Sequence, residues 1–122
     1  MQFKFRKDQR LKSEKLIQEL FDKGSSFYFF PFKVISLPNP VKTVNAHQVL
    51  FSVSKKNFKK AVDRNLIKRR IRESYRLNKN LLPDSPQLVI AYIYTAKEIL
   101  TFAQIQERLV KTFNRFDHVE KI

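Results

Sequence analysis

Residues 87–94 (QLVIAYIY) constrain the fold of this chain more than any other segment, because nearly every position is apolar. Strands with one solvent-facing side alternate between apolar and polar residues, whereas an uninterrupted apolar run is typical of a strand covered on both faces. The run is far shorter than the ~20 residues that a membrane span requires. It therefore predicts the central strand of a sheet that is covered by helices.

The N-terminal third of the chain is expected to contain one helix and one strand. Apolar residues recur at helical spacing over residues 13–23, and Gly24 follows as a residue that can take the left-handed conformation after a helix end. Residues 26–38 (SFYFFPFKVISLP) are rich in aromatic and β-branched residues. They predict one strand, in which Pro31 marks an edge or a bulge. Residues 39–46 are expected to form a loop.

The rest of the chain predicts a second strand and a long basic helix before the apolar strand, and a final helix after it. Residues 47–54 alternate as a half-buried strand does. Asn57 is expected to cap the basic helix, and Pro83 to stop it. Thr101 is expected to cap the final helix, with Gln104 reaching back to it. The order α-β-β-α-β-α predicts an α+β fold, a small mixed β-sheet covered by helices.

Composition removes several classes of function. The chain has 122 residues, no cysteine and one glycine. Its length suits one domain, so residues 1–122 are expected to fold together. Without cysteine there is no disulfide, thiolate zinc site or cysteine nucleophile, and one glycine cannot build a glycine-rich phosphate loop. The N-terminus shows no apolar signal region, and we expect a cytoplasmic protein.

The positive charge is concentrated in one segment. The formal net charge is +14, and residues 55–79 hold 11 basic residues against two acidic ones, Asp63 and Glu73. At 100° per residue, one side of the basic helix gathers a set that we call the basic ridge. Its members are Asn65, Lys68, Arg69, Arg72 and Arg76, with Arg64 at its border.

The basic ridge suits RNA. Guanidinium groups bind phosphate oxygens bidentately, and an amide can bind a ribose hydroxyl or a base edge. The alternative is a solvated face that only keeps the protein soluble. Such a face normally carries glutamates four residues from its basic residues, and this helix offers only two acidic residues. The pattern therefore favours an RNA-binding surface.

No catalytic or metal site is visible in the sequence. The two histidines, His47 and His118, are expected at the surface rather than beside a nucleophile. Asp63 and Glu73 are ten positions apart, which is about 15 Å along a helix axis. That separation is too large for two carboxylates to share one magnesium ion. We expect no active site built from protein side chains.

The basic helix and the residues before it resemble a known motif. The segment FSVSKK is followed, after four residues, by AVDRNLIKRRIRE, and this pattern resembles that of the bacterial ribonuclease P protein component. The resemblance extends from about residue 10 to residue 115. The residues that match the motif are Arg64, Asn65, Lys68, Arg69, Arg72 and Glu73. Two residues depart from it: Leu66 stands where the motif usually has an arginine, and Arg70 stands where the motif often has an apolar residue. Arg70 lies on the same side of the helix as Leu66, and one interpretation is that it supplies the charge lost there.

The resemblance implies a protein subunit of ribonuclease P, an endoribonuclease whose catalytic centre lies in RNA. The ribonuclease P RNA, with magnesium bound through the RNA, would remove the 5′ leader of precursor tRNA to give the mature 5′ end. The basic ridge would bind this catalytic RNA. The single-stranded leader would lie in a cleft between the first helix and the sheet. The positions that match this cleft are Phe21, Phe32, Val34, Lys55 and Lys56.

The resemblance also implies an uncommon connection between strands. About 98 per cent of β-α-β connections between parallel strands are right-handed. The ribonuclease P protein family has a left-handed crossover at its basic helix. Because the matching motif lies in that helix, we expect a left-handed crossover here.

Two other functions stay open. A non-catalytic RNA-binding module, such as a ribosomal protein, would explain the charge but not the matched motif. A peripheral membrane protein would use the basic helix on anionic lipid, but that helix has no tryptophan and needs its apolar side to pack on the sheet. Copurification with catalytic RNA, ribosomes or lipid would separate the three. We expect ribonuclease P RNA and precursor tRNA as partners, no membrane, and no obligate protein partner.

Overall fold

The computed structural model describes residues 9–40, 46–83 and 86–116. These parts of the chain form a four-stranded sheet, three α-helices and a short 3-10 helix. In chain order the elements are α1 (Glu14–Lys23), β1 (Ser25–Phe29), β2 (Phe32–Pro38), β3 (Gln48–Val53), α2 (Ala61–Asn78), η2 (Lys79–Leu81), β4 (Leu88–Tyr94) and α3 (Phe102–Thr112). No helix among the described residues is long and apolar enough to cross a membrane.

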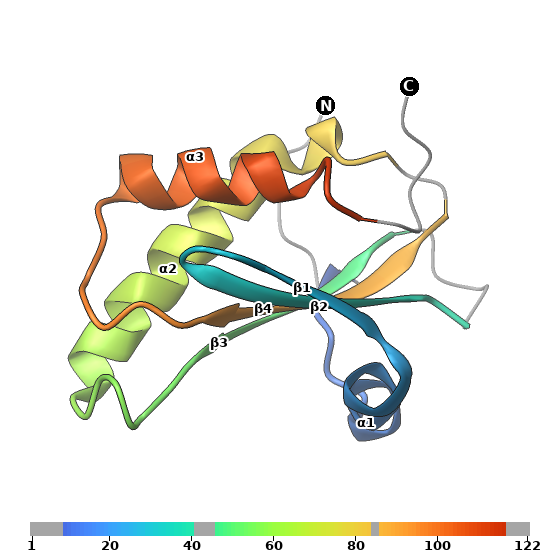
Figure 1. The fold of residues 1–122 in the computed structure, drawn as a ribbon, viewed down its shortest axis with the longest axis horizontal. Coiled ribbons are helices and arrows are strands. Elements are labelled where there is room, and N and C mark those ends of the chain that lie inside the picture. The colour runs from blue at the N-terminus through green and yellow to red at the C-terminus, as the bar shows by residue number, and fades with distance from the viewer. Residues whose placement is uncertain (1–8, 41–45, 84–85, 117–122) are drawn as a thin grey trace.

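The apolar strand β4 is central, as its sequence predicts. The strand order is β1-β2-β4-β3, with β4 antiparallel to β2 and parallel to β3. Helices α2 and α3 cover one face of the sheet and α1 lies on the other (Figure 1). This arrangement confirms the α+β fold with a small mixed sheet. The connection from β3 through α2 joins parallel neighbours, as the resemblance implies, and its hand stays a prediction.

Two hydrophobic clusters of different size hold these layers together. The larger cluster lies between the sheet and α2 and α3, and it includes the fully buried Phe32, Ile67 and Ile105. The smaller cluster lies under α1, where Leu20 meets Ile35 of the sheet. Apolar burial is the main stabilising contribution to a domain of this size. The face under α2 and α3 is therefore the principal core.

Residues 26–38 form two strands rather than one. Phe30 and Pro31 lie in a turn, with a cis peptide bond between them, and β1 and β2 pair antiparallel on either side. Proline has no amide hydrogen for a strand ladder, so it is found where pairing stops. Here the chain reverses at Pro31, whereas an edge or a bulge was expected. Because side chains alternate along a strand, Phe32 faces α2 and α3 while Tyr28 faces the side of α1.

One predicted helix cap is confirmed and one is wrong. The Thr101 hydroxyl accepts a hydrogen bond from the backbone of Gln104, whose side chain reaches back, so the predicted cap of α3 is confirmed. Helix α2 begins only at Ala61 and has no side-chain cap. Asn57 lies in the turn before α2, where the chain inserts Phe58 into the core. The helix starts after that insertion, which the local sequence pattern does not show.

Gly24 is needed for a close approach and not for a left-handed conformation. Its φ is −69° and its ψ is 152°, which is extended backbone open to any residue. A Cβ atom at this position would lie 2.4 Å from the Leu20 carbonyl oxygen and 2.7 Å from Cγ2 of Ile35. Neither contact is possible without movement of the backbone or of a buried side chain. The glycine therefore allows the end of α1 to pack directly on β2.

Candidate nucleic-acid interface

The basic ridge lies on the side of α2 that faces away from the core. The helix buries Ile67, Ile71 and Tyr75 against the sheet and α3. The exposed ridge residues are Asn65, Arg69 and Arg72, and the half-buried ones are Arg64, Lys68 and Arg76. Helical spacing thus places all six side chains along one surface, as expected. Because the apolar side of α2 is buried in the protein, it is not available to insert into lipid.

Two of the ridge residues also make contacts within the protein. Nη1 of Arg64 donates to the carbonyl oxygens of Phe58, at 2.8 Å, and Lys59, at 2.9 Å. Arg76 forms an ion pair with Glu73, and this hydrogen bond is the main cause that lowers the pKa of the Glu73 carboxyl. Arg64 therefore holds the loop that precedes α2. Glu73 stays ionised and offsets part of the positive charge at the Arg76 end of the ridge.

Arg70, which lies near the position of the arginine missing at Leu66, makes a contact within the protein. Its Nη1 donates to the carbonyl oxygen of Leu100, at 2.5 Å, in the segment before α3. On the same side of α2, the Asn78 amide donates to the Gln106 side chain at 2.9 Å. Arg70 thus joins α2 to the start of α3. Its guanidinium keeps its charge in this contact, so a contribution of Arg70 to RNA binding stays a prediction.

Helix α1 leaves one end of its face of the sheet uncovered. Four residues stand opposite one another across the strands there, and we call this row the open sheet face. Its members are Tyr28 of β1, Lys33 of β2, Ile93 of β4 and Ser52 of β3. None of the four is buried, and Tyr28 is 57% exposed. Three gaps between neighbouring strands make the row about 14 Å long.

The Tyr28 ring is oriented by a hydrogen bond across the sheet. The Thr95 hydroxyl, just after β4, donates to the Pro31 carbonyl oxygen at 3.0 Å and lies 3.4 Å from the Tyr28 hydroxyl, which can donate to it. Because β2 lies between β1 and β4, the ring must extend over β2. An exposed aromatic residue paired across the strands with an exposed lysine is typical of single-strand binding, in which a base stacks and a cation contacts the backbone.

The residues predicted to bind the leader divide between two faces. Phe21, near the end of α1, is 50% exposed, and Lys55 and Lys56 are exposed in the turn after β3. Phe32 and Val34 are fully buried in the cluster under α2 and α3. A bound strand cannot reach these two side chains, so placing them in the leader site is wrong. Their side chains point through the sheet to the opposite face, because neighbouring strand residues alternate.

From the sequence alone Tyr28 is a weaker stacking candidate than Phe21 or Phe32, and Lys33 is not a candidate at all. Both lie within residues 26–38, where aromatic residues on nearly every position hide the alternation between faces. The signal that could have found them is Pro31. If the chain reverses there, the alternation restarts, and Lys33 falls opposite Tyr28 on the face that lacks Phe32.

The described parts of the chain contain no cluster that suggests catalysis by the protein. No group of three or more potential metal ligands occurs among them. His47 is buried, which contradicts its expected surface position. Its Nε2 lies 2.7 Å from the Pro83 carbonyl oxygen, and its Nδ1 accepts from the Leu88 amide at 2.9 Å. The ring joins the loop after η2 to the start of β4, which is a structural role; His118 lies outside the described residues.

Known proteins resemble this chain over nearly its whole length. A model of the ribonuclease P family matches residues 5–117. The ribonuclease P protein component of Porphyromonas gingivalis is 34% identical over 118 residues, which cover 93% of this chain and 86% of the relative. That of Petrotoga mobilis is 30% identical over 120 residues, covering 93% and 95%.

Two solved structures share the fold. The RNase P protein of Staphylococcus aureus superposes with a TM-score of 0.75 at 29% identity, covering 92% of this chain and 98% of that protein. The RNase P protein from Thermotoga maritima superposes with a TM-score of 0.75 at 26% identity, covering 88% and 97%. Both alignments are long enough to include the basic ridge and most of the sheet.

Proposed function

Because this chain belongs to the ribonuclease P protein family, as a subunit of an endoribonuclease that processes tRNA 5′ ends, we propose a division of its surface between two RNAs. The basic ridge binds the catalytic RNA. The open sheet face binds the single-stranded 5′ leader of precursor tRNA, together with Phe21, Lys55 and Lys56. The protein works in the cytoplasm and needs no obligate protein partner.

The placement of α2 carries this proposal. Its apolar residues are buried in the core, so the helix is fixed on the sheet and cannot reorient when RNA binds. Lys68, Arg69 and Arg72 then form a fixed line of charge, and none of them makes an ion pair within the described residues. Phosphates neutralised by such a line release counterions, which drives association with RNA.

The open sheet face supports the leader half of the proposal. Tyr28 supplies a ring that any base can stack on, and Lys33 supplies charge beside it. Stacking is tolerant of sequence because every base has a π-face. Leaders differ in sequence from one tRNA to another, so a site that stacks bases without reading their edges suits this substrate.

The chemical step is proposed to belong to the RNA. Carboxylates that could hold magnesium are not gathered among the described residues, and His47 is engaged in backbone contacts. Magnesium would therefore be held by the catalytic RNA. The protein would contribute by positioning the leader and by offsetting phosphate repulsion between the two RNAs, which matters most when magnesium is scarce.

The alternative functions have less support. A ribosomal protein would not account for the family match over residues 5–117. Lipid binding through α2 would require an apolar side that is already buried.

Reconstitution with a ribonuclease P RNA tests the proposal. At low magnesium, we expect the protein to accelerate cleavage of precursor tRNA and to tighten binding of precursor more than of mature tRNA. Protein without RNA should not cleave either. Cleavage by the RNA-free protein would disprove the proposed division of labour, and equal affinity for precursor and mature tRNA would disprove leader binding.

A further inference from the structure

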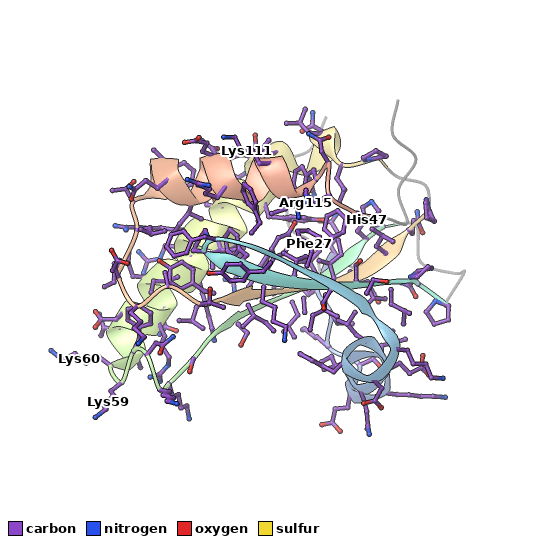
Figure 2. The ribbon with its side chains drawn as sticks, viewed as in Figure 1. Phe27, His47, Lys59, Lys60, Lys111 and Arg115 are labelled. Carbon is purple, nitrogen blue, oxygen red and sulfur yellow. The ribbon has the colours of Figure 1, made fainter. Side chains whose placement is uncertain are left out.

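A second group of basic residues lies at the opposite edge of the sheet from α2. Arg108 belongs to α3 and Arg115 follows its end, and we call these two residues the arginine pair. The guanidinium carbon of Arg115 lies 5.1 Å from the ring centroid of Phe27 and 5.7 Å from that of Phe29. That of Arg108 lies 5.4 Å from the Phe29 ring. Figure 2 shows Arg115 beside Phe27.

The arginine pair is oriented by aromatic rings rather than by acidic residues. Both arginines are exposed, and neither makes an ion pair or hydrogen bond through its side chain in the described parts of the chain. Attraction between a cation and a ring face holds the guanidinium plane. The Phe27 ring is itself fixed, because it packs edge to face on the fully buried Phe116 at 5.6 Å. The N–H groups at the rim of each guanidinium therefore remain available to a ligand.

This arrangement suits single-stranded RNA. The guanidinium rim can donate two parallel hydrogen bonds to a phosphate, and the outer side of the guanidinium plane can stack on a base. An arginine that is already held flat loses less conformational freedom on binding than a free side chain. The ridge residues Arg64 and Arg76 differ, because each donates hydrogen bonds within the protein.

Strand β1 connects the arginine pair to the open sheet face. It is an outer strand of the sheet, and within the described ranges its one partner strand is β2. Tyr28 lies on one side of β1, and Phe27 and Phe29 lie on the other because side chains alternate. An RNA strand that leaves the open sheet face at Tyr28 passes around one strand to meet the arginine pair.

We propose that the arginine pair binds leader nucleotides that lie farther from the cleavage site than those on the open sheet face. This inference rests on the proposed function, namely that the leader binds at the open sheet face. The competing explanation is that the two arginines only shield Phe27 and Phe29 from water. In that case their replacement would lower stability without changing the dependence of binding on leader length.

The test uses the holoenzyme and precursor tRNAs with leaders of about 4 and about 16 nucleotides, the range of common single-strand site sizes. The variant R108Q/R115Q should bind the long-leader precursor about 30-fold more weakly, as expected for two lost phosphate contacts in solvent. Its affinity for the short-leader precursor should not change. For the long leader, the slope of log K against log salt should fall by about 1.4, or roughly 0.7 for each lost phosphate contact.

A control variant with the same net charge separates the effect of contacts made by the arginine pair from the effect of the protein's overall positive charge. K12Q/K97Q removes the same number of charges from exposed positions that make neither an ion pair nor a ring contact among the described residues. It should bind both precursors as the unmodified protein does. R108K/R115K keeps the charge but not the planar group, and it should recover only part of the long-leader affinity.

Three results would overturn the inference: unchanged long-leader affinity in R108Q/R115Q, an equal loss for both leaders, or the same loss in the control. Thermal melting verifies that R108Q/R115Q and R108K/R115K are folded. If only one of them folds, its affinities for the long-leader and short-leader precursors can still be compared with those of the unmodified protein. Failure of the underlying proposal looks different. In that case the unmodified protein itself would show no preference for precursor over mature tRNA.

Discussion

The two faces of the sheet use neighbouring aromatic residues for opposite purposes. On the face under α2 and α3, Phe32 is fully buried, and its ring centroid lies 5.4 Å from that of Tyr92 and 6.2 Å from that of Tyr94. On the face of α1, Tyr28 is more than half exposed. The residue types are similar, but two helices cover one face and a single helix covers part of the other. In a sheet this small, aromatic side chains stay exposed where helical cover is absent.

The largest effect is expected for Phe32→Ala, which would test whether the covered face is core alone. Removing a buried phenylalanine side chain costs about 3–5 kcal/mol of the free energy of unfolding. Chemical denaturation should show this loss. Leader affinity per folded molecule should stay unchanged. If the variant kept full stability and lost only leader binding, the covered face would not be core alone, and Phe32 would belong to the leader site.

The variant K68Q/R69Q/R72Q tests whether the catalytic RNA binds to the basic ridge, which lies on neither face of the sheet. At roughly 1 kcal/mol for each solvated phosphate contact, affinity for ribonuclease P RNA should fall by about 3 kcal/mol. The slope of log K against log salt should fall by about 2 to 3. Thermal stability should change little, because the three side chains lie outside the core. An unchanged slope would mean that this line of charge is only a solvated face.

Tyr28→Ala is the counterpart of the Phe32 variant on the open face. Loss of one stacked base should weaken binding of precursor tRNA by about 1–3 kcal/mol. The free energy of unfolding should change much less than for Phe32→Ala, since the ring is largely in solvent. Tyr28→Phe is the matched control: it keeps the ring but loses the bond to Thr95, so most of the affinity should remain. If alanine and wild type bind precursor equally, the leader lies elsewhere.

The smallest effect is expected for Glu73→Gln. At neutral pH the substitution removes a negative charge from the ridge and releases Arg76, so affinity for ribonuclease P RNA should rise by a few-fold. The pKa of Glu73 is lowered, so the carboxylate keeps its charge until the pH falls through that lowered value. The advantage of the variant should therefore vanish only in acid. Binding titrations at neutral and acidic pH measure this difference.

The helices and the central strand could be predicted from sequence because their signals are local. The spacing of Ile67 and Ile71 identifies the buried side of α2, and Thr101 with Gln104 marks the start of α3. The hairpin could not be predicted in the same way. A turn at Pro31 carries no glycine or asparagine, and the pairing of β2 with β4 joins residues far apart in the chain.

The candidate site shows the same limit. The basic ridge follows from helical periodicity alone. The roles of Arg64 and Arg70 do not, because each depends on a carbonyl group that tertiary packing brings within reach. The placement of Phe32 in the leader site is wrong because the alternation of side chains shows only that neighbouring residues lie on opposite faces of the sheet. It does not show which of the two faces is covered by helices. That choice is made by α1, α2 and α3 together.

Gly24, the single glycine of the chain, has a consequence for how the leader is recognised. It sits at the end of α1 with no room for a methyl group, so it acts as a spacer and not as a hinge. The wall that α1 forms beside the open sheet face is therefore rigid. At the proposed leader site, different leaders would be accommodated by rotation of the exposed Phe21 side chain. If the leader binds here as proposed, a rigid wall beside an adjustable ring would suit a catalyst that serves many substrates better than one that selects a single sequence.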